Sequence, residues 1–503
     1  MIYYLKHKLQ KLNWSVIGNV IGFILIAEAG LLLFPTVVDL IYQEGKFMPY
    51  LGMGVFCFII GFILSRIKVK HSEYFAKEGM IAVGLGWIVV SFFGGLPFYF
   101  TGEMNNLADC FFEAVSGFTT TGSSILTEVE SLCHATLFWR SFTHWIGGMG
   151  ILVFILALLP RSNDRNMHIM RAESPGPTIG KLVPRLKQTA MLLYEMYMGL
   201  TVIMIIFLLV GGMPLFDALC NAFGTAGTGG FAIKNTSIGW YNNTYYEVVI
   251  TVFMILFGVN FNMYYFLLHK DFKSVFKNEE FRGYIGIIIF SIVCITINIL
   301  SMYGGNVLTS LRLASFQVGS IITTTGYSSC DYSVWPQFSK MILFLLTIIG
   351  ASAGSTGGGV KVSRMLIIVK KIKLDIQKLI HPQKVEAITM DGKVVDTETV
   401  NQILAYFCCF ICIFGVCLFV VALDNFDFET TVSAVATCIG NVGPGFGLCG
   451  PMGNFSMFSD LSKLVLSFAM LIGRLEIYPI IIFLFPIFRL PSLFKVNKKK
   501  NIS

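Results

Sequence analysis

Charged residues are scarce in this sequence. Only 13% of its 503 residues are Asp, Glu, Lys or Arg, whereas soluble domains carry about 25%. Apolar residues make up 55% of the chain, and the mean hydropathy is +0.72. These values exclude a water-soluble enzyme, a disordered chain and a nucleic-acid-binding protein. Apolar runs of about 20 residues recur along the whole chain, which is typical of an integral membrane protein.

The sequence also lacks the motifs of the common enzyme and nucleotide sites. It contains no His-Glu-x-x-His helix and no Walker loop, and the glycine run at 354–359 does not end in Gly-Lys-Ser/Thr. Most of its twelve cysteines lie in apolar runs, including Cys408-Cys409-x-x-Cys412, which has no partner pair at a metal-ligand spacing. We therefore expect neither an enzyme nor a covalently bound cofactor.

Ten apolar segments are long enough to cross a membrane, so the sequence predicts an all-α fold. Four shorter apolar stretches, near 107–118, 215–224, 308–321 and 428–438, are too short to cross but can enter and return. Such re-entrant backbone is tolerated only where protein or a water-filled cavity surrounds it. The predicted crossings are residues 14–42, 48–65, 79–100, 136–159, 189–212, 245–268, 283–303, 338–368, 400–423 and 461–489.

The positions of the basic residues predict the orientation of the chain. Lys and Arg gather before the first span, after the second, in segments 161–187, 270–282 and 361–393, and in the C-terminal tail. The positive-inside rule then places both termini in the cytoplasm. The basic residues outside these segments are Lys46, Arg140, Lys234, Arg312, Lys340, Lys463 and Arg474.

After the first two spans, one unit occurs four times: a span, a short apolar helix, a polar loop with glycine, and a second span. Aligning Gly122, Gly229, Gly326 and Gly443 puts Thr-Thr-Thr-Gly at the same place in the first and third copies. The loops read Thr-Thr-Thr-Gly-Ser at 119–123, Gly-Thr-Gly-Gly-Phe at 227–231, Thr-Thr-Thr-Gly-Tyr at 323–327 and Gly-Asn-Val-Gly-Pro at 440–444.

Loops of this composition suit a cation that loses its water. Backbone carbonyls, with threonine hydroxyls nearby, can replace a hydration shell, and glycine allows the positive φ that turns carbonyls towards one axis. Packing of Gly and Thr between helices would explain one such loop, but four in register favour a shared pore. The predicted fold is an all-α integral membrane protein in which two extra transmembrane helices precede four pseudo-symmetric helix–pore-loop–helix repeats around one central pore.

Acidic residues lie near the starts of three of the short helices. A carboxylate there complements the helix dipole, so the opposite, partly negative ends would face the pore and favour a cation. Ordinary capping at a wet interface is an equally good explanation. The third short helix has Arg312 and no acid. The acids are Asp109, Glu113, Asp217, Asp427 and Glu429.

Two further features lie inside predicted spans. Residues 350–359 contain five glycines, which a regular helix tolerates poorly at about 1 kcal/mol each; we predict a gate there, with a close helix crossing as the alternative. Arg474 lies in span 461–489, where a charge costs about 2.5–3.5 kcal/mol, which favours a functional role over a structural ion pair. The gate residues are Gly350, Ala351, Gly354, Gly357, Gly358, Gly359 and Lys361.

Together these motifs resemble the Trk/Ktr/HKT superfamily, and within it the membrane subunit of Trk-type potassium uptake systems. The Ser-Pro-Gly-Pro loop and the two extra N-terminal spans resemble the Trk branch. The most specific matches are Ser-Gly-Phe-Thr-Thr-Thr-Gly at 116–122, Trp-Arg-Ser-Phe-Thr-His-Trp-Ile-Gly-Gly-Met-Gly at 139–150, Glu-Ser-Pro-Gly-Pro at 173–177, Gly-Gly-Gly-Val-Lys at 357–361 and Gly-Asn-Val-Gly-Pro-Gly at 440–445.

The resemblance implies that backbone at the two residues before each filter glycine coordinates K⁺, the only metal expected. It also implies that the 350–359 loop lies beneath the filter and that Arg474 points into the pore. The second and fourth loops depart from Thr-Thr-x-Gly, so their sites are expected to be weaker. The implied pairs are Thr120 and Thr121 before Gly122, Gly227 and Thr228 before Gly229, Thr324 and Thr325 before Gly326, and Asn441 and Val442 before Gly443.

The expected function is potassium-selective uptake across the bacterial cytoplasmic membrane through a gated, channel-like pore; a potassium symporter coupled to sodium or protons is the alternative. The resemblance further implies a homodimer and a cytoplasmic TrkA-type nucleotide-binding subunit. The basic loops 161–187 and 361–393 are predicted to dock that subunit or anionic lipid. The expected domains are the N-terminal helices at 1–70 and the pore repeats at 71–160, 161–270, 271–395 and 396–503.

Overall fold

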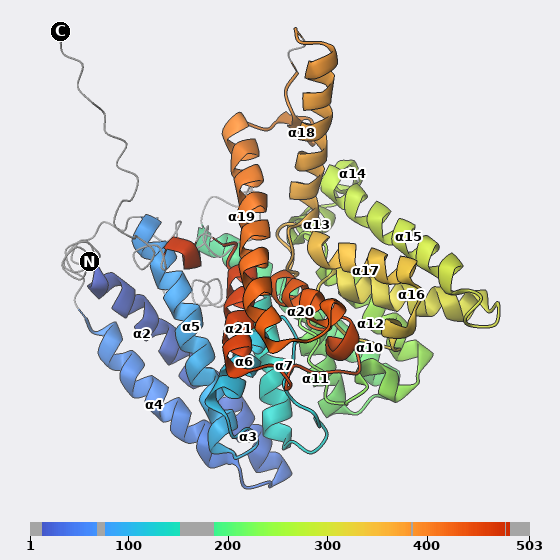
Figure 1. Ribbon diagram of the computed structural model, residues 1–503. Coiled ribbons are helices and arrows are strands. Elements are labelled where there is room, and N and C mark those ends of the chain that lie inside the picture. The colour runs from blue at the N-terminus through green and yellow to red at the C-terminus, as the bar shows by residue number, and fades with distance from the viewer. Residues whose placement is uncertain (1–12, 68–75, 151–185, 384–385, 478, 483–503) are drawn as a thin grey trace, which may run out of the picture.

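The computed structural model describes most of the chain as helices (Figure 1). The described residues are 13–67, 76–150, 186–383, 386–477 and 479–482. The basic N-terminus, the motif at 173–177, nearly all of the basic loop 161–187 and the basic tail therefore lie outside the described residues. Within the described part, the only sheet is a two-stranded hairpin of β1 (Thr389–Met390) and β2 (Lys393–Val394).

The first helices form a packed group beside the rest of the molecule (Figure 1). Helix α2 packs closely on α4 because glycines face each other: a Cβ on Gly22 would lie 2.8 Å from the carbonyl oxygen of Gly61, and the reverse contact is also 2.8 Å. Small residues allow this kind of approach in membranes. The bounds are α2 (Trp14–Leu31), α3 (Leu33–Tyr42) and α4 (Phe47–Ser65).

The remaining helices follow the predicted order of long helix, short helix and second helix. The four short helices are 12, 12, 16 and 13 residues long, and each begins within a residue of its predicted start. In order along the chain, the groups are α5 (Ala76–Phe100), α6 (Leu107–Phe118) and α7 (His134–Gly148); α10 (Leu186–Val210), α11 (Leu215–Ala226) and α12 (Thr244–Phe257); α15 (Glu279–Ile299), α16 (Val307–Ile322) and α17 (Gln337–Ile349); and α19 (Thr397–Val421), α20 (Phe428–Gly440) and α21 (Asp460–Arg474).

Not all ten predicted crossings are continuous helices. Among the described residues, six helices are long and apolar enough to cross a membrane, or seven if one bent pair counts as a single span. The other three crossings contain α7, α17 and α21, which have 15, 13 and 15 residues. Helix α17 ends at the predicted glycine-rich break. Helix α21 ends at Arg474, so this arginine terminates a helix and does not lie within one.

The predicted span 245–268 is wrong as a single helix. It bends by 92° between α12 and α13 (Phe261–Leu268). A Cβ on Gly258 would lie 2.3 Å from the Tyr284 hydroxyl, and the Asn260 side chain accepts a hydrogen bond from the Asn262 amide to start the new helix. A break in a membrane helix leaves backbone groups that need new partners; the intramembrane loop described below supplies two of them.

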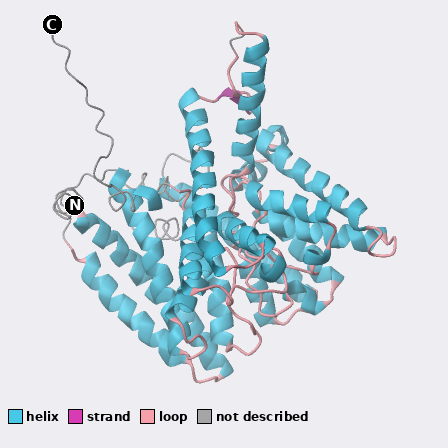
Figure 2. Cartoon of the chain, in the orientation of Figure 1, coloured by secondary structure: helices cyan, strands magenta, loops and turns pink. Residues whose placement is uncertain are grey.

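Helices α18 (Val362–Ile380) and α19 extend beyond the rest of the bundle (Figure 1). Helix α18 follows the intramembrane loop, projects from the body and is joined to α19 through the β1–β2 hairpin (Figure 1). The short α14 (Phe272–Lys277) lies beside this projection. Loops gather at the centre of the molecule, between the helical groups (Figure 2). This central region contains the four predicted pore loops.

Candidate ion pathway

The four pore loops have the same backbone conformation. Each begins where a short helix ends, with one residue in the left-handed region followed two positions later by a glycine of positive φ. The residue and glycine pairs are Thr120 (54°) and Gly122 (82°), Thr228 (52°) and Gly230 (77°), Thr324 (59°) and Gly326 (83°), and Asn441 (54°) and Gly443 (99°). A non-glycine residue with positive φ is uncommon, so four at equivalent places indicate a shared structural requirement.

Backbone hydrogen bonds repeat across the loops as well. In each loop, the amide between the left-handed residue and the glycine donates to the carbonyl five residues earlier, in the short helix. These bonds run from Thr121 to Ser116 (2.9 Å), from Gly229 to Gly224 (2.8 Å), from Thr325 to Ser320 (2.8 Å) and from Val442 to Thr437 (2.9 Å). The partly negative end of each helix is therefore held against its loop, which favours a cation there.

The loops contact one another in a closed cycle. A Cβ on Gly122 would lie 1.9 Å from the Gly229 oxygen, and one on Gly230 would lie 2.0 Å from the Thr325 oxygen. A Cβ on Gly326 would lie 2.1 Å from the Val442 oxygen, and one on Gly443 would lie 2.6 Å from the Thr121 oxygen. Each glycine thus meets the backbone of the next loop, and the fourth loop returns to the first. Four loops of a single chain form one ring.

This geometry shifts the alignment of the second loop by one residue. The sequence pattern aligned Gly229 with Gly122, but Gly230 has the matching positive φ and makes the matching contact with the next loop. Gly227 is the C-cap of α11. Adjacent glycines at 229 and 230 made the two registers indistinguishable by composition. Thr228 and Gly229 therefore occupy the positions of Thr120 and Thr121.

Buried polar side chains of the short helices bind the segments that follow the loops. Glu113 forms an ion pair with Arg140 at 2.8 Å, with side chains 0% and 2% exposed, and accepts hydrogen bonds from Ser124 and the Ile125 amide after the first loop. Gln317 occupies the equivalent position in the third repeat unit, seven residues before the left-handed residue of its loop. Its side chain donates to the carbonyl of Cys330, which follows that loop. Sequence reasoning placed Glu113 as a helix-start acid and gave Arg140 no role; their separation along the chain hid the pair.

His144 joins the first and second loops. Its Nδ1 donates to the Gly117 carbonyl at 2.8 Å, and its Nε2 accepts from the Phe231 amide at 3.1 Å. The imidazole is fully buried, and both of its nitrogens are used by backbone. His144 is therefore a hydrogen-bonded packing residue that fixes the first two loops relative to each other.

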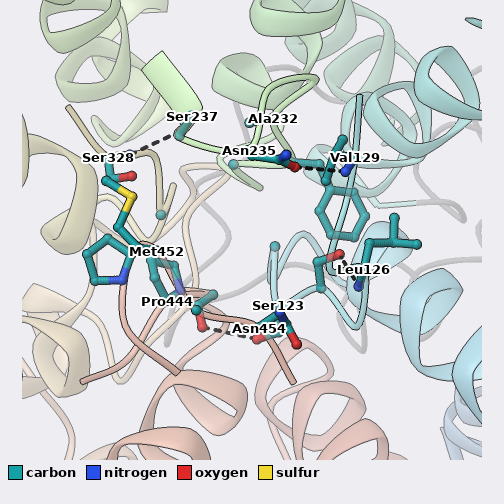
Figure 3. Close-up of a pocket in the computed structure, with 18 of the residues that line it drawn as sticks. Ser123, Leu126, Val129, Ala232, Asn235, Ser237, Ser328, Pro444, Met452 and Asn454 are labelled. Carbon is teal, nitrogen blue, oxygen red and sulfur yellow. Dashed lines mark hydrogen bonds between the residues drawn. The ribbon is translucent and has the colours of Figure 1, made fainter. Parts of the chain in front are cut away.

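A cavity of about 130 Å³ lies on one side of the ring. Its lining includes all four positive-φ glycines, Gly122, Gly230, Gly326 and Gly443. Residues that follow these glycines also line it, including Ser123, Ser328 and Pro444 (Figure 3). The cavity therefore lies at the ends of the loops that point away from the short helices.

The glycine-rich segment 350–361 forms a loop on the opposite side of the ring. A Cβ on Gly357 would lie 2.9 Å from the Thr323 oxygen, and one on Gly358 would lie 2.6 Å from the Gly440 oxygen. The Gly358 amide also donates to the Thr324 hydroxyl at 2.6 Å. The segment therefore packs directly against the starts of the third and fourth pore loops, at their helix ends.

The same segment completes the broken helix pair α12 and α13. The Ser352 amide donates to the Gly258 carbonyl at 3.2 Å, and the Phe261 amide donates to the Gly354 carbonyl at 3.0 Å. Glu280, at the start of α15 and 6% exposed, accepts from the amides of Ala353 and Ser363. One carboxylate thus ties the first part of the loop to the start of α18, which follows it. The sequence analysis did not single out Glu280, since an acid at the start of a span is ordinary.

Lys361 and Arg474 donate hydrogen bonds to the backbone of this region; Lys361 is buried and Arg474 is partly buried. Lys361 is 2% exposed and donates to the Gly357 carbonyl. Arg474 donates to the Thr356 carbonyl at 2.8 Å and to the carbonyls of Gly147 and Gly148 at the end of α7. Glu476 pairs with Arg364 at 2.5 Å. Arg474 therefore bridges the intramembrane loop and the first repeat.

Comparison with known proteins identifies the family. A family model described as a cation transport protein, TrkH, matches residues 50–495. The chain belongs to the TrkH family. It is 33% identical to the Trk system potassium uptake protein TrkH of Salmonella typhimurium over 483 residues, which cover 95% of this chain and 99% of that protein. It is also 33% identical to the Trk system potassium uptake protein TrkG of Escherichia coli over 477 residues, 93% of this chain and 97% of that one.

A solved structure in the TrkH family has the same fold. The crystal structure of the potassium transporter TrkH from Vibrio parahaemolyticus superposes with a TM-score of 0.85 at 29% identity, covering 95% of this chain and all of that one. The resemblance drawn from the motifs and the all-α membrane fold are confirmed. This family is one of cation transport proteins.

Proposed function

We propose that this chain carries potassium ions through the ring of four loops. The closed cycle of contacts from Gly122 through Gly230, Gly326 and Gly443 supports this best, because backbone carbonyls in a ring can replace the water of a dehydrated cation. The ends of four short helices add negative partial charge at the same place. The relatives named above are potassium uptake proteins, which favours potassium as the ion.

The proposed filter takes its ligands from backbone at the left-handed residue and the residue after it in each loop. In the second loop, these residues are Thr228 and Gly229, with Gly230 as the filter glycine and Gly227 as the helix end. We further propose that 71–160, 161–270, 271–395 and 396–503 are the four pore repeats. The other proposed ligands are Thr120 and Thr121, Thr324 and Thr325, and Asn441 and Val442.

The proposed gate is the loop 350–361 together with Arg474. The loop lies against the helix ends of the filter, and Arg474 links it to α7. A fixed positive charge on the path of a cation raises the barrier for its passage. An opening movement would carry the loop away from Thr324 and Gly440. Because the loop already separates α17 from α18, this movement would not require any continuous helix to unwind.

The surroundings of the pore follow from charge and from the family. We propose that the protein lies in the cytoplasmic membrane with both termini inside. Most of its basic residues fall in segments on the same side as the termini, and the positive-inside rule assigns that side to the cytoplasm. A homodimer and a TrkA-type nucleotide-binding subunit are the proposed partners. The projecting α18 carries Lys370, Lys371, Lys373 and Lys378, which makes the α18–α19 projection (Figure 1) the proposed docking surface among the described residues.

Ion flux into liposomes tests the proposal. The purified chain, and Arg474→Ala as a variant with a weakened gate, would be given K⁺ or Na⁺ gradients with and without an opposing proton or sodium gradient. We expect K⁺ flux that follows its own electrochemical gradient and exceeds Na⁺ flux. Flux that requires the second ion would make the protein a symporter, and equal K⁺ and Na⁺ fluxes in both proteins would contradict the filter.

A further inference from the structure

Three metal-ligating side chains from distant parts of the sequence meet at the outer end of α3. Asp39 belongs to α3, Glu44 to the turn between α3 and α4, and Cys133 is the N-cap of α7. One ligand atom from each lies within 4.8 Å of the other two. The C-terminal end of α3 lies at the end of the bundle opposite the α18 projection (Figure 1).

Asp39 is the member that an ordinary structural role does not explain. Its residue is 1% exposed, and neither carboxylate oxygen has a hydrogen-bond partner among the described residues. Leaving a buried carboxylate unpaired is costly, so such groups are normally paired with a cation or bound to a metal. The unpaired oxygens lie beside the Cys133 sulfur and the Glu44 carboxylate.

Glu44 is oriented from both sides of the turn. The flanking residues Gln43 and Gly45 have positive φ, at 58° and 78°, which turns the Glu44 side chain back towards α7. Its carboxylate accepts from the His134 amide at 2.7 Å and from His134 Nδ1 at 2.8 Å. The carboxylate oxygens retain lone pairs for a metal, and carboxylates that bind metals are themselves hydrogen-bonded by outer partners.

Within the described part of the chain, no Lys or Arg side chain balances these acids. Among the described residues, Lys46 pairs with Glu103 at 3.4 Å, and no Lys or Arg forms an ion pair with Asp39 or Glu44. The Thr136 hydroxyl bonds the Cys133 sulfur at 3.2 Å, the Tyr50 hydroxyl and the Glu103 carboxylate, and makes no bond to Asp39. The Glu44 side chain is 26% exposed, which leaves a path by which an ion can enter.

We propose that Asp39, Glu44 and Cys133 bind a thiophilic divalent transition-metal ion of the Zn²⁺ class. Sulfur with carboxylate oxygen suits such ions, whereas Mg²⁺ and Ca²⁺ take oxygen ligands alone. Cys133 loses its thiol proton to solvent on binding and becomes a thiolate, and water completes the four-coordinate shell. The ion would fasten α3, from the N-terminal group, to α7, whose other end carries the carbonyls that bind Arg474.

Metal binding to the purified full-length chain tests this site directly. After removal of metal with a chelator, the protein would be titrated with Co²⁺ as a spectroscopic substitute for Zn²⁺, and then with Zn²⁺ in competition. We expect one ion per chain, an absorption band from charge transfer between thiolate and Co²⁺, and loss of that band on Zn²⁺ addition. Asp39→Asn and Cys133→Ser should abolish the band, and His134→Ala should weaken binding roughly 10- to 100-fold.

Matched variants separate the site from general effects on the fold. Cys330→Ser removes a partly buried cysteine from another part of the chain, and Glu128→Gln removes an acid just before α7 that forms no ion pair among the described residues. Both should bind Co²⁺ like the unmodified protein. The proposal is overturned if the unmodified protein binds no stoichiometric Co²⁺ or Zn²⁺, or if folded Asp39→Asn and Cys133→Ser retain the band. None of these outcomes bears on potassium transport.

Discussion

The guanidinium of Arg474 donates a hydrogen bond of 2.8 Å to the backbone carbonyl of Thr356. Thr356 belongs to the intramembrane loop, and Arg474 is the last residue of α21. The same guanidinium reaches the carbonyls of Gly147 and Gly148. One side chain therefore holds the loop, the first repeat and the fourth repeat in a single arrangement beneath the ring of pore loops.

Replacing this arginine should loosen the proposed gate. Hydrogen bonds from a charged group contribute about 1.5–3 kcal/mol each, and a change of 1.4 kcal/mol shifts a two-state population about tenfold. We expect Arg474→Ala to raise K⁺ flux into liposomes by about tenfold or more. Arg66→Ala, at the exposed end of α4, removes an arginine elsewhere and should leave flux unchanged. Unaltered flux in Arg474→Ala would remove this arginine from the gate.

Glu280 offers an independent test of the same loop. It accepts hydrogen bonds from the amides of Ala353 and Ser363 at 2.7 and 3.1 Å, so Glu280→Ala releases the loop and the start of α18 from this carboxylate. We expect K⁺ flux without a partner subunit to rise about tenfold, from the loss of one to two charge-assisted bonds. Glu279→Ala is the matched control, because Glu279 is adjacent to Glu280 but pairs with Lys370 and does not contact the loop. Equal fluxes in the two variants would contradict the role given to Glu280.

Local patterns predicted most of the helices, and contacts between distant residues account for the differences. Apolar stretches located α6, α11, α16 and α20 to within a few residues, because each is short and bounded by polar loops. The break at Gly258 depends on Tyr284, which packs where a side chain would stand, and no local signal shows that contact. The register of the second loop depended on whether Gly229 or Gly230 meets Thr325, which two adjacent glycines leave open.

A substitution in the first loop of the proposed filter should reduce ion discrimination. A Cβ on Gly122 would lie 1.9 Å from the Gly229 oxygen, so Gly122→Ser must move the carbonyls of two loops. We expect the K⁺ to Na⁺ flux ratio to fall about tenfold, or 1.4 kcal/mol. Gly102→Ser is the control, because Gly102 also has positive φ, at 76°, but nothing lies within 4 Å of its Cβ position. An unchanged ratio in Gly122→Ser would exclude this loop from the filter.

The ion pair between Glu113 and Arg140 should be essential to stability. Its side chains are 0% and 2% exposed, and breaking a buried pair costs about 3–5 kcal/mol because a charge is left without a partner. Arg140 also lies 4.2 Å from the centre of the Phe231 ring, in the second loop. We expect Glu113→Gln to lower the thermal midpoint of the detergent-solubilised protein clearly, and to reduce K⁺ selectivity in the protein that remains folded.

The surface pair of Glu130 and Lys234 is the natural comparison. These residues lie 3.7 Å apart with side chains 35% and 23% exposed, and exposed pairs contribute only about 0–1 kcal/mol. Glu130→Gln should therefore leave the thermal midpoint and the selectivity close to those of the unmodified protein. If the two substitutions shift the midpoint equally, Glu113 does not hold the first loop, and the anchoring of the ring has to come from backbone contacts such as that of Thr121 with Ser116.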